Sequence, residues 1–159
     1  MRRFMLTLAG AGLVLSSAQA QQTRESATLP SGARWQAERP ANWNGTLLLW
    51  SRGYAMKAGE PEIAPANVRA ELLAAGYALA GSDYGSGGWA LEEAVPAQIG
   101  TVKAFATLYG RPRRVIGWGY SMGGLVTTAL AERKGARVID GGIAMCASIG
   151  GAVGMLNMG

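Results

Sequence analysis

Four short apolar runs divide this 159-residue chain, and none of them alternates regularly with polar residues. Uninterrupted apolar runs of this length are typical of β-strands that are covered on both faces, as in a parallel sheet. We therefore predict strands at residues 46–50, 77–81, 115–118 and 141–146.

Apolar residues at helical spacing occupy the segments between these runs. They predict a short helix at residues 67–75, a longer one at 95–109 and a third at 125–133. Strands that alternate with helices are typical of an α/β fold, with a mostly parallel sheet and helices on both faces. The apolar faces expected for the first two helices consist of Val68, Leu72 and Ala75, and of Val95, Ile99, Val102, Phe105 or Ala106, and Tyr109.

The chain ahead of the first predicted strand has a different composition. Residues 1–20 have a basic start, an apolar stretch and the small-residue pattern Ala18-Gln19-Ala20, which is typical of a secretory signal peptide cut before Gln21. Residues 21–43 are polar and interrupted by prolines, which indicates an N-terminal arm or an edge hairpin. Residues 44–159 would form the α/β domain of a secreted or periplasmic protein, with no membrane span after signal cleavage.

Charge and cysteine content exclude several classes of function. Without Arg2 and Arg3 the formal net charge falls from +5 to +3, and the remaining basic residues form no stripe with interleaved aromatic residues. We therefore expect no nucleic-acid partner. The chain has one cysteine and no histidine, so it offers no clustered metal ligands, and neither a metal nor another cofactor is expected. Apolar neighbours predict that Cys146 is a buried strand residue, and its pairing partner stays open.

A candidate nucleophile follows the third predicted strand. Ser121 lies within the segment Gly119-Tyr120-Ser121-Met122-Gly123, between an apolar run and a helix-forming run. In this strand–turn–helix context, Gly-x-Ser-x-Gly is typical of a nucleophile elbow, where glycines let the strand and helix approach and the serine backbone is strained. A glycine-rich turn without chemistry is the alternative. We predict that Ser121 is a catalytic nucleophile.

Three separated segments resemble the N-terminal half of secreted bacterial α/β-hydrolases of the esterase, lipase or peptidase kind. Residues 44–54 resemble a strand with its oxyanion loop, residues 76–85 the next strand and loop, and residues 119–124 the elbow. The resemblance implies a partial α/β-hydrolase fold in which the C-terminal strands are absent. It also implies a small-molecule ester or related acyl substrate, while substrate identity and oligomeric state stay open.

The resemblance further implies which groups would hold the oxyanion. They are the backbone N–H groups of Met122 and of either Gly53 or Tyr54. Relatives commonly have a histidine where this chain has Arg52, which we expect to bond nearby carbonyl groups; steering of anionic substrates is the alternative. Asp83 follows a strand on the same side of the sheet, and we expect it to have a structural role in its flexible, glycine-rich loop.

The other members of a catalytic triad are missing from the sequence. The chain has no histidine, and Glu132 and Asp140 are expected to be surface or capping residues. We therefore expect the chain as given to be nearly inactive, as the front portion of a longer serine hydrolase. The alternative is a non-catalytic pseudo-hydrolase or binding module that keeps the sheet without the chemistry.

Overall fold

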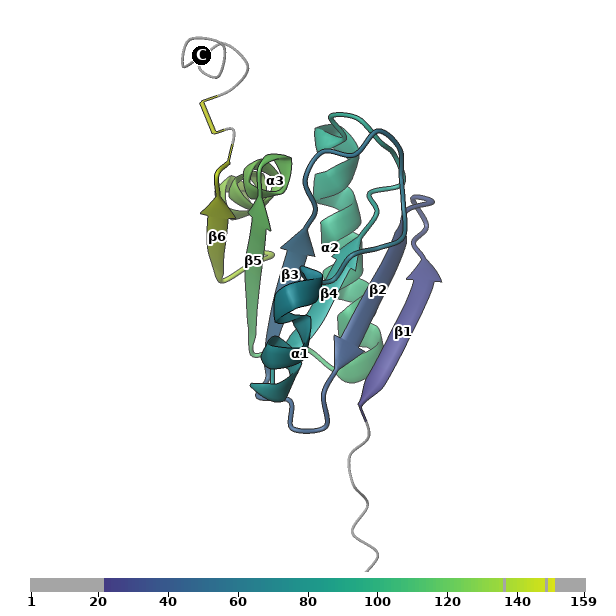
Figure 1. Ribbon diagram of the computed structural model, residues 1–159, viewed down its shortest axis with the longest axis vertical. Coiled ribbons are helices and arrows are strands. Elements are labelled where there is room, and N and C mark those ends of the chain that lie inside the picture. The colour runs from purple at the N-terminus through teal and green to yellow at the C-terminus, as the bar shows by residue number, and fades with distance from the viewer. Residues whose placement is uncertain (1–21, 136, 148, 151–159) are drawn as a thin grey trace, which may run out of the picture.

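The computed structural model describes residues 22–135, 137–147 and 149–150. These residues form one six-stranded mixed sheet with three α-helices (Figure 1). The predicted signal peptide, residues 1–20, lies outside the described residues. In chain order the elements are β1 (Thr23–Thr28), β2 (Arg34–Arg39), β3 (Thr46–Ser51), α1 (Ala66–Ala74), β4 (Ala78–Ser82), α2 (Leu91–Tyr109), β5 (Arg114–Tyr120), α3 (Met122–Glu132) and β6 (Gly141–Met145).

The four strands predicted from apolar runs form the parallel part of the sheet. The strand order is β1-β2-β4-β3-β5-β6, and β3 pairs in parallel with both β4 and β5, while β5 pairs in parallel with β6. Parallel strands end on the same side of a sheet, so the segments that follow β3, β4 and β5 meet at one end of the molecule. These segments carry Gly53, Asp83 and Ser121.

The residues ahead of β3 form a hairpin at one edge of this sheet. β1 pairs antiparallel with β2, and β2 pairs antiparallel with β4. β1 is largely exposed, whereas Trp35 and Ala37 of β2 are buried in the main core. The inner strand β2 is polar as well, and its Gln36 and Glu38 are buried.

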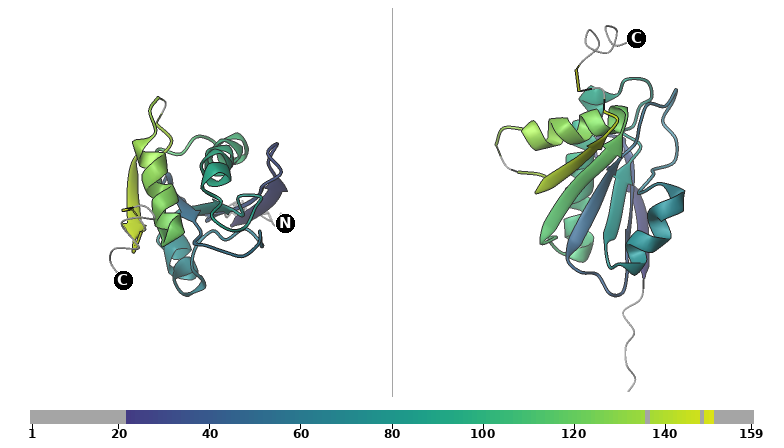
Figure 2. Two further views of the ribbon diagram at one scale, coloured as in Figure 1. Left: turned by 90° about the horizontal axis from the view of Figure 1, so that it is seen from above. Right: turned by 60° about the vertical axis from the view of Figure 1, so that its left-hand side comes forward.

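Helices cover both faces of the sheet (Figure 2). α2 and α3 pack on one face, where Leu47 and Leu49 of β3 belong to the main core. α1 lies against the other face, where Leu79 of β4 packs with Ile63 and Leu73 in a smaller cluster. Because neighbouring residues of β3 and β4 face two covered sides, their sequences are uninterrupted apolar runs.

The helices differ from the prediction at their ends and in the faces they bury. α2 begins at Leu91 rather than Val95, so Pro96 lies inside it. Its buried residues are Ala94, Ala97, Gln98, Thr101 and Phe105, while Val95, Ile99 and Val102 are only partly buried. In α1 the buried residue is Leu73, and Ala75, which was expected on the apolar face, is exposed beyond the end of the helix.

The sixth strand differs from the other three parallel strands in its burial. β6 lies at the edge of the sheet, and Ile143 and Met145 are 54% and 36% exposed. Cys146 follows the strand and is exposed, so the prediction of a buried strand cysteine is wrong. An apolar sequence allows a strand to be buried, but burial also requires a covering layer. Within the described residues, no helix is long and apolar enough to cross a membrane.

Candidate active site

Ser121 lies at the junction between β5 and α3 with an unusual backbone conformation. Its φ is 54° and its ψ is −128°, a combination that costs an L-residue free energy and persists only where the surrounding structure enforces it. The residue is partly exposed, directly ahead of the first turn of α3. The sequence predicted a strained serine at this turn, and the backbone geometry confirms that expectation.

The flanking glycines explain how this conformation is enforced. A Cβ atom added at Gly119 or at Gly123 would overlap the carbonyl oxygen of Ser51, at the end of the neighbouring strand β3. Only a residue without a side chain allows β5, α3 and β3 to approach this closely. The close approach brings the end of β3 directly beside the turn that holds Ser121.

The three candidate oxyanion donors lie around this turn. Gly53 follows β3, and a Cβ atom added to it would be 3.8 Å from the Cβ of Ser121. Met122 is the first residue of α3 and is buried, whereas Tyr54 is 49% exposed. Among the described residues, the backbone N–H groups of Met122, Gly53 and Tyr54 have no backbone acceptor. An N–H group in that state is free to donate to a ligand.

Arg52 connects the loop after β3 with the loop after β4. Its guanidinium donates hydrogen bonds to the carbonyl oxygens of Gly53, Asp83 and Ser86, at 3.0, 2.9 and 2.6 Å. The side chain is buried, with only 5% of the residue exposed. These contacts agree with the expected bonding of nearby carbonyl groups and leave little of Arg52 to meet a substrate.

Tyr84 completes this connection from the other side. Its hydroxyl donates to the carbonyl oxygen of Arg52 at 3.1 Å, and its ring lies 4.4 Å from the Arg52 guanidinium carbon. Burial raises the pKa of Tyr84 well above its usual value, although the nearby Arg52 charge opposes this shift. The phenol therefore stays neutral and keeps its hydrogen bond.

Asp83 has the structural role that the sequence suggested. The carboxylate is buried and accepts hydrogen bonds from the backbone N–H groups of Arg34 and Gly85 at 2.8 and 2.9 Å. It also accepts a bond from the Arg34 side chain at 3.0 Å. Hydrogen bonds to Glu60 and then to Asp83 raise the pKa of Arg34. The glycine-rich loop expected to be flexible is therefore anchored at Asp83 and Tyr84.

Gln98 is a positioning residue that the sequence analysis did not identify. It is fully buried in α2, where its amide donates to the Trp50 carbonyl oxygen at 2.6 Å and to the Ser51 hydroxyl at 2.9 Å. The Ser82 hydroxyl donates to the Gln98 side-chain oxygen at 3.2 Å. A polar residue at a buried helical position was the available signal, because a buried amide needs partners of this kind.

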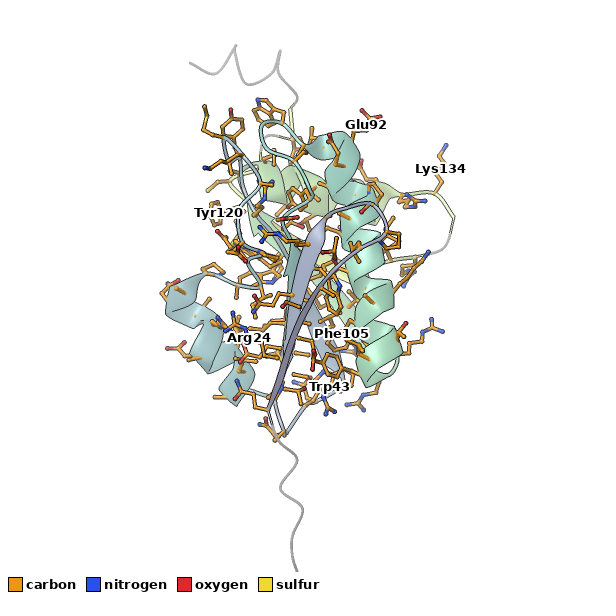
Figure 3. The ribbon with its side chains drawn as sticks, turned by 90° about the vertical axis from the view of Figure 1, so that its right-hand side faces the viewer. Arg24, Trp43, Glu92, Phe105, Tyr120 and Lys134 are labelled. Carbon is orange, nitrogen blue, oxygen red and sulfur yellow. The ribbon has the colours of Figure 1, made fainter. Side chains whose placement is uncertain are left out.

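Exposed aromatic side chains lie on the segments next to Ser121 and on the neighbouring loop after β4. Tyr54 and Trp89 form an edge-on pair with ring centroids 5.9 Å apart, and Tyr120 packs 5.3 Å from the buried Trp50 ring. The loops that carry Tyr54 and Trp89 are joined by a hydrogen bond from the Gly88 N–H to the Ala55 carbonyl oxygen. Tyr120, labelled in Figure 3, directly precedes Ser121. The segments at this end of the sheet therefore carry exposed aromatic surface.

The two remaining acidic candidates lie away from Ser121. Glu132 is exposed in the last turn of α3, at the end of the helix opposite the serine. Asp140 precedes β6 and accepts a hydrogen bond from the Val115 N–H at 2.8 Å, near the start of β5. Both are surface or capping residues, as expected. In the part of the chain that the structure describes, no cluster of side chains could hold a metal ion.

Comparison with known proteins identifies the fold. No family model matches the chain. It is 32% identical over 128 residues to an o-phthalyl amidase of Xanthobacter agilis, covering 79% of this chain and 27% of the amidase. An acylaminoacyl peptidase of Pyrococcus horikoshii superposes with a TM-score of 0.62 at 14% identity, covering 89% of this chain and 26% of the peptidase. A hormone-sensitive lipase from a metagenome library has a TM-score of 0.53 at 19% identity, covering 80% of this chain and 44% of the lipase.

The described residues therefore have part of the α/β-hydrolase fold, with the sheet and elbow expected for it. The proteins that the chain is similar to are hydrolases: an amidase, a peptidase and a lipase. The part of the amidase that matches this chain is 27% of the amidase's length, so the chain spans about a quarter of it.

Proposed function

We propose that this chain contributes the nucleophile and the oxyanion site of a serine hydrolase that cleaves an ester or amide of a small carboxylic acid. The backbone of Ser121 carries the proposal, because its left-handed φ of 54° at a strand–helix junction is a strain without structural benefit of its own. The relatives that share this fold are hydrolases, which supports the same class of reaction.

The proposed chemistry is acyl transfer to Ser121. Its hydroxyl oxygen attacks the substrate carbonyl carbon, and the hydroxyl proton passes to a general base. The carbonyl oxygen becomes an oxyanion, which accepts hydrogen bonds from the N–H of Met122 and that of Gly53 or Tyr54. The tetrahedral intermediate expels an alcohol or amine, which takes up the proton. Water then hydrolyses the acyl-serine by the same steps, releasing the acid.

The general base is the part that the printed sequence does not supply, because it contains no histidine. We propose that a histidine and an acid lie in polypeptide outside these 159 residues. Removing a triad member leaves at most roughly 10³- to 10⁴-fold acceleration over water. The 159-residue chain alone should therefore hydrolyse substrates only weakly.

The proposed acyl group is apolar or aromatic. Tyr54, Trp89 and Tyr120 are 49%, 61% and 47% exposed at the same end of the sheet as Ser121, and Tyr54 pairs with Trp89. Aromatic pairs of this kind add favourable contacts beyond the burial of their area. The name of the similar o-phthalyl amidase points to an aromatic acyl group and an amide bond.

The test is hydrolysis of matched nitrophenyl esters and nitroanilides that carry an acetyl or a benzoyl group. The assay uses the 159-residue chain and, if the reading frame continues, the longer product, each beside its Ser121→Ala variant. We expect the longer product to prefer benzoyl substrates and to lose at least about 10³-fold activity with Ser121→Ala. Activity that survives Ser121→Ala unchanged would exclude Ser121 as the nucleophile.

The absence of histidine favours a second candidate, a non-catalytic binding module. A genuine module would fold cooperatively on its own and bind benzoate-like acids at the exposed aromatic side chains without hydrolysing their esters. If the reading frame ends at codon 159 and thermal unfolding of the chain is cooperative, this second function replaces the first.

We also propose that the protein is exported, secreted or periplasmic, on the basis of the signal-peptide pattern in residues 1–20. N-terminal sequencing of protein recovered from the periplasm or medium should begin at Gln21. Recovery of the intact chain from the cytoplasm alone would contradict export.

A further inference from the structure

Positive charge is concentrated in one part of this chain. Residues 22–102 contain six basic and eight acidic side chains, whereas residues 103–140 contain seven basic and only two acidic ones. The excess charge therefore belongs to the second segment, which runs from the middle of α2 to the start of β6.

The structure gathers most of these basic residues around a single groove. The groove has a volume of about 920 Å³ and lies between α2, the loop before β5 and the segment that follows α3. It shares no residue with the loops around Ser121. In Figure 3, Lys134 and Tyr120 lie on opposite sides of α2. The basic residues that line this basic groove are Lys103, Arg111, Arg113, Arg133, Lys134 and Arg137.

Most of these charges have no acidic partner. The guanidinium of Arg137 lies 3.9 Å from the carboxylate of Asp140, and Arg113 donates to the carbonyl oxygen of Asn44. Among the described residues, the other four have no carboxylate within ion-pairing distance. All six are exposed. Unpaired cations that share a concave surface create a positive potential that attracts anions.

The floor of the basic groove is apolar. Among the residues described around it, no aromatic side chain lines the groove, so it offers no platform on which nucleic-acid bases could stack. A purely polar anion such as phosphate would leave the apolar floor in contact with water. The floor residues are Ile99, Val102, Ala106, Val115 and Val138.

We propose that the basic groove binds an anionic lipid at a membrane surface. The lipid phosphate lies between the basic side chains, and the first part of its acyl chains lies along the apolar floor. A basic side chain near an anionic bilayer strengthens binding roughly fivefold. Several unpaired cations around one groove therefore suffice for reversible attachment to the membrane, independently of the chemistry at Ser121.

The test measures binding of the purified protein to phosphatidylcholine vesicles with and without phosphatidylglycerol. Three double variants are compared with the unaltered protein, and all four proteins have the same N-terminal residues. Arg111→Glu with Lys134→Glu reverses two charges of the groove. Arg24→Glu with Lys57→Glu makes the same charge change at exposed positions elsewhere. Val102→Thr with Val138→Thr makes the floor polar with little change of shape.

We expect binding only to vesicles that contain phosphatidylglycerol. The groove charge variant should weaken it at least about tenfold and the control variant less than about twofold, while the floor variant weakens it about threefold. Thermal unfolding by circular dichroism verifies that each variant is folded. Equal losses in both charge variants, or no vesicle binding at all, would overturn the proposal. If the floor variant binds vesicles as well as the unaltered protein does, and inorganic polyphosphate binds as tightly as vesicles, the groove is a site for soluble polyanions instead.

Discussion

β5 and β6 are neighbouring parallel strands with similar apolar, glycine-rich sequences, yet they have different surroundings. β5 pairs with β3 on one side and with β6 on the other, α3 packs against it, and it ends at Tyr120, directly before Ser121. β6 pairs with β5 on one side only, and Ile143 and Met145 are exposed. The comparison teaches that strand formation follows from the strand's own sequence, whereas burial depends on its neighbours.

The close packing around β5 is tested most severely by Gly123→Ala. The added Cβ would overlap the Ser51 carbonyl oxygen, a backbone atom that cannot move aside as a side chain could. We expect the free energy of unfolding to fall by at least about 3 kcal/mol, measured by urea denaturation. Gly59→Ala is the matched control, because no atom of the described residues lies within 4 Å of its added Cβ. It should change stability by less than about 0.5 kcal/mol. Equal effects at the two positions would show that β3 and α3 do not approach this closely.

The second prediction concerns the buried hydrogen bonds beside Ser121. Arg52→Met removes the donors to the carbonyl oxygens of Asp83 and Ser86 while keeping much of the apolar volume. Leaving these groups without partners should cost about 2–4 kcal/mol in urea denaturation. Lys57→Met, at an exposed position, should cost less than about 0.5 kcal/mol.

The same variant decides between the two roles considered for Arg52. If Arg52 steers anionic substrates, Arg52→Met should selectively weaken the use of acidic esters by an active form of the enzyme. With a structural role, acidic and neutral esters should lose activity alike.

The sequence allowed the parallel strands, the helices between them and the turn at Ser121 to be predicted. Those features depend on local patterns, such as the run Thr46 to Trp50 and the glycines around Ser121. The buried side-chain hydrogen bonds and the exposure of individual residues depend on tertiary contacts instead. A glutamine at a buried helical position indicates that hydrogen-bond partners exist, but the partners Ser51 and Ser82 are far away in sequence, so no local pattern identifies them. The exposure of Cys146 was not predicted, because the sequence of a strand does not show whether another layer of the structure covers it.

Alkaline pH offers a smaller test of the central region. The unfolded chain ionises Tyr84 near pH 10, whereas burial raises the pKa of Tyr84 in the folded protein. Above about pH 10 the unfolded state therefore loses this proton and the folded state keeps it, so stability falls as pH rises. Tyr84→Phe should cost about 1 kcal/mol at neutral pH, through loss of the bond to the Arg52 carbonyl oxygen, and should reduce the alkaline decline. An alkaline decline identical in the two proteins would show that Tyr84 does not cause it.

A substitution at the β6 edge should have the smallest effect on the free energy of unfolding and a clear effect on self-association. Ile143 is 54% exposed, so Ile143→Lys should change the free energy of unfolding by less than about 0.5 kcal/mol. A lysine on an edge strand disfavours pairing with another chain, and self-association measured by sedimentation or light scattering should decrease. Ser26→Lys on β1, the polar strand at the opposite edge, is the control and should leave association unchanged. A large loss of stability in Ile143→Lys would instead mean that a covering layer packs on β6 in solution, and the contrast between β5 and β6 would then be smaller than their exposures indicate.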